Sequence, residues 1–224
     1  MRISHDAYNR VFDTVYLGML GNVLVAIATL PFVGVLFATE LSRSWPFLAV
    51  PAPSLGPALV ALFAMFTHHA EGSPGSHIRA FVRAWRSSFR RAVPAAALAT
   101  AAITVLSVDA AAAGRSHRMA IVVPLLLMLD VLVVAVALLV LVGLAERPST
   151  RIRDLARPTI YLVVRRWYLS ALSLVAVAVL MGVVTTRPTI GLGFLAAPML
   201  YIVWANARFT LQPIFAGDAI RHRA

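Results

Sequence analysis

The sequence predicts an all-α membrane protein, with residues 1–224 forming one polytopic bundle of about six transmembrane helices in hairpins and basic interfacial helices on the cytoplasmic side. Two observations lead to this fold class. Of the 224 residues, 60% are hydrophobic and only 13% are charged, and the mean hydropathy is +0.84, which is far from the composition of water-soluble domains. Six apolar stretches are also long enough to cross a hydrocarbon core of ~30 Å, which takes about 20 helical residues.

The predicted spans follow one another along the whole chain. They cover 15–38, 47–67, 92–113, 119–144, 168–186 and 190–205. The second span contains Pro51, Pro53 and Pro57. Because proline removes a helical hydrogen bond, we expect the first half of this span to be kinked or partly re-entrant. The sixth span is short and contains Pro198.

The distribution of arginine predicts how the spans are oriented. All 20 basic residues are arginine. With the amino terminus inside, sixteen lie on the inner side, and four lie outside, namely Arg43, Arg115, Arg118 and Arg187. By the positive-inside rule, we expect a protein of the bacterial cytoplasmic (inner) membrane with both termini in the cytoplasm. This distribution also explains the pI of about 11.5 without nucleic-acid binding, which requires basic residues gathered on one soluble face.

The segment 77–92 has the pattern of an amphipathic helix. Apolar residues recur at helical spacing as Ile78, Phe81, Val82, Trp85 and Phe89, and the opposite face carries Arg79, Arg83, Arg86 and Arg90. We expect this helix to lie in the membrane plane and to offer its arginines to anionic headgroups. It is interpreted as an anchor for the third span or as a surface for a partner's cytoplasmic loop. We prefer the anchor, since basic amphipathic helices usually bind the membrane surface first.

Asp130 is the most informative single residue. It follows Met119 by 11 residues, so it lies ~16 Å into its span, near the bilayer midplane. Thr104 of the preceding span has a similar depth, and Thr100 is one turn away. If the facing sides of the two helices match, these hydroxyls can donate to the carboxylate. A proton or cation site in a transport path and a protonated acid that holds helices together are both consistent with this position, and we prefer the second.

Other polar residues predict packing rather than chemistry. Asn22 in the first span and Asn206 at the end of the last can bond across helices. The adjacent His68 and His69 point about 100° apart on a helix, so we expect no metal site there. The chain has no cysteine and no lysine. It also lacks the GxSxG, HExxH and GxxxxGK[ST] motifs, so we expect no catalytic centre and no cofactor.

Part of the sequence resembles a known family. The run Asn22-Val23-Leu24, then Leu30-Pro31, and later Phe81, Trp85 and Phe89-Arg90 are similar to the YesL-like family of bacterial membrane proteins, a domain of unknown function. The resemblance covers roughly the first 95 residues. It implies an association with carbohydrate uptake through sugar ABC importers.

Three functional hypotheses follow. The first is a non-catalytic accessory protein that assembles with or regulates a sugar ABC permease, with the face formed by Phe81, Trp85 and Phe89 as the candidate contact. The second is a small secondary transporter that uses an intramembrane polar site of Asp130, Thr104 and Asn22. The third is a membrane-surface scaffold that acts through Arg83, Arg86 and Arg90.

Overall fold

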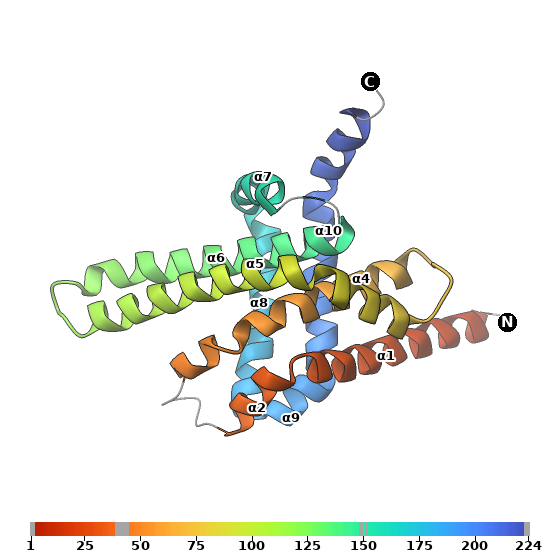
Figure 1. Ribbon diagram of the computed structural model, residues 1–224, viewed down its shortest axis with the longest axis horizontal. Coiled ribbons are helices and arrows are strands. Elements are labelled where there is room, and N and C mark those ends of the chain that lie inside the picture. The colour runs from red at the N-terminus through yellow and green to blue at the C-terminus, as the bar shows by residue number, and fades with distance from the viewer. Residues whose placement is uncertain (1–2, 39–44, 148–149, 151, 222–224) are drawn as a thin grey trace.

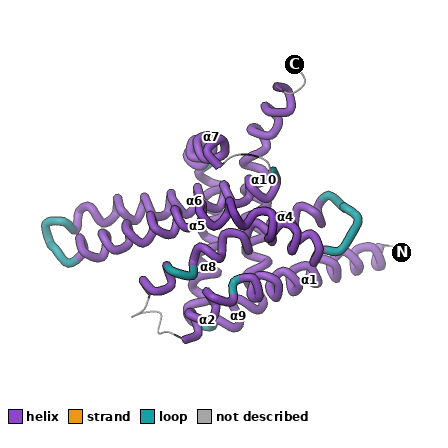
Figure 2. The backbone as a smooth tube through the Cα atoms, viewed as in Figure 1, coloured by secondary structure: helices purple, strands orange, loops and turns teal. Residues whose placement is uncertain are grey.

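The protein is an all-α bundle, as the sequence predicts. A computed structural model describes residues 3–38, 45–147, 150 and 152–221. In these ranges every regular element is helical, and Figure 2 shows only short loops between the helices. Five described helices are long and apolar enough to cross a membrane, and a bent pair of helices adds a sixth if it is one broken span. The chain is therefore a multi-pass membrane protein.

The first apolar stretch is a bent pair of helices. α1 (Ile3–Ala28) and α2 (Leu30–Ala38) meet at Thr29, and their apolar parts form an angle of 79°. Pro31 explains the break, because it has no N–H for a helical hydrogen bond and its ring displaces the preceding turn. At the bend, the carbonyl of Val25 accepts both the amide and the hydroxyl of Thr29, at 2.9 and 2.7 Å. The expected span 15–38 is thus a pair of helices bent at Thr29 and not one straight helix.

The second stretch begins with two 3₁₀ helices and continues as one α-helix. η1 (Trp45–Ala49) and η2 (Ala52–Ser54) contain or border the prolines at 46, 51 and 53, and α4 (Leu55–Ala70) follows. α4 is the centre of the core. Its fully covered side chains include Leu62, Phe63, Met65 and Phe66. Gly56 allows the backbone of α4 to approach the third span closely.

The predicted interfacial helix and the third span form one helix. α5 (His77–Gly114) runs for 38 residues without a break and includes Pro94. At 1.5 Å per residue it is ~57 Å long, about twice the thickness of a hydrocarbon core. Residues 77–91 therefore extend the span rather than turning into a separate helix, because no residue before Pro94 interrupts the helical hydrogen bonds.

The remaining helices complete two hairpins that cross. α5 turns through η3 (Ala120–Val122) into α6 (Val123–Glu146), and Figure 1 shows these two long helices side by side, extending beyond the rest of the molecule. After α7 (Ile152–Arg165), α8 (Trp167–Thr186) leads through α9 (Pro188–Ile190) and the π-helix η4 (Gly191–Leu195) to α10 (Ala196–Arg221). α8 and α10 pack together and contact α6 where the hairpins cross.

Candidate functional site

A polar cluster joins three helices at one end of the bundle. We define it as Thr67 and Glu71 at the end of α4, Glu146 at the end of α6, and Trp204 and Arg208 on α10. The Thr67 hydroxyl donates to Glu146 Oε1 at 2.7 Å. The indole N–H of Trp204 lies 3.2 Å from the same carboxylate oxygen and 3.2 Å from the hydroxyl oxygen of Thr67. One carboxylate oxygen thus ties α4, α6 and α10 together.

Arg208 supplies the positive charge of the cluster. Its Nε lies 3.6 Å from Glu146 Oε1, and its Nη2 lies 3.3 Å from Glu71 Oε1. Its guanidinium group also lies over the Trp204 ring, 5.4 Å from the ring centroid. The Glu146 side chain is only 9% exposed, while that of Glu71 is 52% exposed. Of the two ion pairs, the one with Glu146 is therefore less screened by solvent.

Aromatic packing supports the cluster from the apolar side. Phe66 of α4 contacts Tyr201 and Trp204 of α10, with ring centroids 5.2 and 6.0 Å apart, and Tyr201 and Trp204 also pack on each other at 5.2 Å. Such aromatic contacts stabilise beyond the area that they bury. The indole of Trp204 is thereby held with its N–H toward Glu146.

Sequence reasoning missed this cluster, although a signal for it was present. Glu71, Glu146 and Arg208 each follow an even-numbered predicted span, so all three fall at the same membrane boundary. Opposite charges at one boundary of a bundle are natural partners. Hydropathy gives no weight to charges at the ends of helices, so the sequence draws attention to Asp130 at the midplane instead.

Asp130 has a hydroxyl partner, but not the one expected. Ser107 of α5 donates to Asp130 Oδ2 at 2.9 Å, whereas Thr104 donates to the carbonyl of Thr100 in its own helix at 2.8 Å. The condition for pairing Thr104 with Asp130 is therefore not met, because the facing turns of the hairpin bring position 107 opposite position 130. Asp130 Oδ1 is buried and has no hydrogen-bond partner within the described part of the chain.

Asn22 bonds across helices at a second point, as its position predicts. Its side chain is buried. The amide nitrogen donates to the carbonyl of Gly193 at 2.9 Å, and the amide oxygen accepts the backbone N–H of Ala197 at 2.6 Å. Both partners belong to or follow the π-helix η4, where the ordinary helical hydrogen bonds are interrupted. Asn22 thus satisfies backbone groups of η4 and α10 and does not join Asp130 or Thr104 in one site.

The proposed partner face of α5 is divided by the fold. Phe81 is buried in the core and Trp85 packs against it, whereas Phe89 remains exposed. Arg83, Arg86 and Arg90 are exposed as well. Phe81 is therefore a packing residue, and the surface left for other molecules consists of Phe89, its exposed apolar neighbours and the arginines.

The chemistry of these sites is mainly that of interhelical bonding. Within the described ranges, no group of three or more His, Asp or Glu side chains is placed to hold a metal ion. His77 packs edge-on against the rings of His68 and His69 at the turn between α4 and α5.

Comparison of the chain with protein-family models, with curated proteins and with solved structures finds no match. A functional proposal for this chain therefore rests on its geometry and its sequence.

Proposed function

We propose that this protein is a non-catalytic accessory protein of the bacterial cytoplasmic membrane, which assembles through its α5–α6 hairpin with the permease of a sugar ABC importer. One observation carries the proposal. The most apolar stretch of α5 has a mean hydropathy of 1.7, yet only 6% of its residues are buried, compared with 28% to 39% in the other four long apolar helices. Much of α5 is thus open to another membrane helix.

The exposed hairpin has a groove that suits helix packing. Ala95, Ala96, Ala99 and Ala102 of α5 face apolar residues of α6 across a groove of ≈340 Å³. These alanines span ~10 Å of helix axis. Small side chains allow a second helix to approach closely, which is the main source of helix association in lipid. A transmembrane helix of the permease is the occupant that we propose.

The polar interior supports a structural rather than a transporting role. Glu146 Oε1 is engaged by Thr67, Trp204 and Arg208, and both ends of the Asn22 amide bond to backbone. Groups that are committed to interhelical bonds are not free to bind and release a sugar. The kind of partner is suggested by the YesL-like resemblance alone, which links such proteins to carbohydrate uptake.

The orientation that we propose has both termini in the cytoplasm. In Figure 1 the first turns of α1 lie at the end of the molecule away from the α5–α6 turn, and the last turns of α10 lie at the end away from α9. The arginine-poor segments contain that turn, with Arg115 and Arg118, and the start of α9, with Arg187. The positive-inside rule assigns these segments to the outer side.

Crosslinking from the exposed hairpin tests the proposal. A photo-reactive residue would replace Leu98, which is 75% exposed beside the groove, and a control would replace Val175 on α8, which is 58% exposed. In the native host, a carboxyl-terminal tag would then recover the adducts for identification. We expect a sugar permease on position 98 and only lipid on position 175. Recovery of lipid alone at both positions would refute the assembly.

A packing variant separates a helix partner from a general membrane effect. Ala99→Leu fills the groove, whereas Ala101→Leu adds the same side chain on the opposite side of α5, about 200° around the helix. We expect Ala99→Leu to reduce permease recovery and sugar uptake, and Ala101→Leu to leave both unchanged. Equal loss in the two variants would show that the groove is not the contact.

A secondary transporter is the second candidate, and the unbonded oxygen of Asp130 favours it. Asp130 Oδ1 is buried and has no hydrogen-bond partner among the described residues, so it is available to accept a bond from a transported ion or solute. Asp130→Asn would abolish proton-coupled uptake in a transporter. An accessory protein would keep its function in this variant, with at most a modest loss of stability.

A further inference from the structure

An open groove on the first turns of α5 combines cationic and apolar side chains. It has a volume of ≈660 Å³ and is lined by Ile78, Arg79, Val82, Arg83, Arg86 and Ser87. The arginines follow one another by four and three residues, so they form one row along the helix. Ile78 and Val82 are exposed beside that row. A ligand of this groove should therefore have a negative group and an apolar part.

The arginines of the groove have no acidic partner in the described part of the chain. No ion pair involves Arg79, Arg83 or Arg86 there, and the nearby acids Glu71 and Glu146 are paired with Arg208. Within α5 the first acidic residue is Asp109, far from this row. Because guanidinium groups remain charged at every physiological pH, an anionic group of another molecule would find these arginines unpaired by the described residues.

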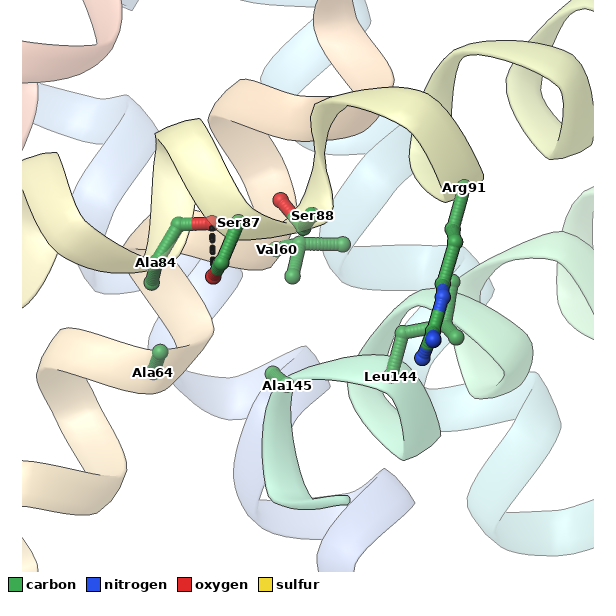
Figure 3. Close-up of a pocket in the computed structure, with 8 residues that line it drawn as sticks. All are labelled: Val60, Ala64, Ala84, Ser87, Ser88, Arg91, Leu144 and Ala145. Atoms are coloured by element: carbon green, nitrogen blue, oxygen red, sulfur yellow. Dashed lines mark hydrogen bonds between the residues drawn. The ribbon is translucent and has the colours of Figure 1, made fainter. Parts of the chain in front are cut away.

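A small pocket with three polar side chains in its lining adjoins the groove at Ser87. Figure 3 shows its eight lining residues, with Ser87, Ser88 and Arg91 on α5 and apolar side chains from α4 and α6. Its volume of ≈50 Å³ has room for about three to five water-sized groups, which is the size of one phosphate. The two hydroxyls bond only weakly to their own helix, at 3.2 Å for Ser87 and 3.4 Å for Ser88, so they can rotate to donate to an anion.

We propose that this groove and pocket form a binding site for an anionic phospholipid. The phosphate is bound by Ser87, Ser88 and the neighbouring arginines, and the acyl chains extend from there along the exposed apolar part of α5 that follows residue 91. Guanidinium groups match the oxygens of a phosphodiester with paired hydrogen bonds. A basic pocket between transmembrane helices at the cytoplasmic boundary is a favourable place for an anionic headgroup. The exposed apolar stretch of α5 next to the pocket favours a lipid over a free phosphate.

Lipid binding to the purified protein tests this site. The protein in a neutral detergent would be titrated with phosphatidylglycerol or with phosphatidylcholine, and bound lipids would be counted by native mass spectrometry. We expect selective binding of phosphatidylglycerol. In the double variant Arg83→Gln and Arg86→Gln, we expect the affinity to fall about 30-fold, at roughly fivefold for each arginine. The matched control, Arg115→Gln with Arg118→Gln at the far turn of the hairpin, should leave the affinity unchanged.

Two further measurements separate the site from a diffuse charge effect. Ser88→Leu fills the pocket and leaves every arginine in place, so it should also weaken phosphatidylglycerol binding. If the larger side chain prevents folding, Ser87→Ala removes one hydroxyl donor, leaves every arginine in place and should weaken binding as well. Inorganic phosphate at millimolar concentration should not displace the lipid. Equal binding of the two lipids, an equal loss in the control pair, or complete displacement by inorganic phosphate would each overturn the proposal.

Discussion

Removal of the Glu146 carboxylate should loosen the contact between α4, α6 and α10. Glu146→Ala removes the acceptor of the hydrogen bonds from Thr67 and Trp204 and breaks the ion pair with Arg208. Each donor keeps a second acceptor, because Thr67 also donates to the Phe63 carbonyl at 3.1 Å, Trp204 lies 3.2 Å from Thr67 Oγ1, and Arg208 pairs with Glu71. No donor is therefore orphaned, and the large penalty of a broken buried ion pair does not apply.

The size of the effect follows from the three interactions that the Glu146 carboxylate makes. Two interhelical hydrogen bonds contribute about 0.6 kcal/mol each in membrane proteins, and a partly screened ion pair contributes about 1 kcal/mol. We therefore expect Glu146→Ala to lower the free energy of unfolding by about 2 kcal/mol, or roughly 30-fold in the folded-to-unfolded ratio. Glu146→Gln keeps an acceptor for Thr67 and Trp204, so it should cost only about 1 kcal/mol.

Reversible unfolding in mixed micelles with increasing sodium dodecyl sulfate, followed by circular dichroism, measures these differences. Glu71→Ala is the matched control, because Glu71 contacts the same arginine but is largely exposed, and its loss should cost about 0.5 kcal/mol or less. The double variant with Arg208→Gln isolates the coupling between the two charges. If Glu146→Ala costs no more than Glu71→Ala, the cluster does not hold the three helices together.

Three other predictions concern the remaining close contacts. Gly56→Ala places a methyl group 2.6 Å from the Ala92 carbonyl oxygen and should cost about 1–3 kcal/mol of unfolding free energy, whereas Gly182→Ala, with no atom within 4 Å, should cost nothing in the same unfolding assay. Asn22→Leu leaves backbone groups of the π-helical segment unsatisfied and should cost about 1–3 kcal/mol, and a loss as small as that of Gly182→Ala would contradict its bridging role. Ser107→Ala should lower the free energy of unfolding by about 0.6 kcal/mol in the wild type. In the Asp130→Leu background the same change should have no effect, which a double-mutant cycle would measure.

The sequence was sufficient for the fold class but not for the course of the helices. Hydropathy and length predict the apolar helices because lipid requires each crossing segment to satisfy its own backbone. Hydropathy does not reveal where a helix bends or continues. Thr29 and Pro31 break the first stretch by local chemistry, whereas Pro94 lies inside α5 without ending it. The same residue type thus has two outcomes, which depend on the surrounding helices that a single sequence does not display.

The candidate sites show the same division between position and partner. Depth along a span predicted that Asp130 needs a hydroxyl from the facing helix, but the identity of that hydroxyl depends on the rotation of both helices, and Ser107 is the one that faces it. Asn22 was correctly expected to bond across helices, yet its acceptor is a π-helical carbonyl. Side-chain partners across a bundle are set by helix rotation, which period and depth alone do not determine.

The chain carries far more positive than negative charge. Only 9 acidic residues accompany the 20 arginines, and two of these acids, Glu71 and Glu146, share the single guanidinium group of Arg208. In this cluster, two acids of the membrane boundary where most arginines are predicted to lie are paired with a single arginine. Arg79, Arg83 and Arg86 have no acidic partner in the described part of the chain. They lie on α5, whose long apolar stretch is the least buried among the five long apolar helices. The positive-inside rule accounts for an excess of arginine at this boundary, so it is the position of the row on the least buried of the five long apolar helices that makes α5 the surface on which the proposed lipid and partner contacts should be tested.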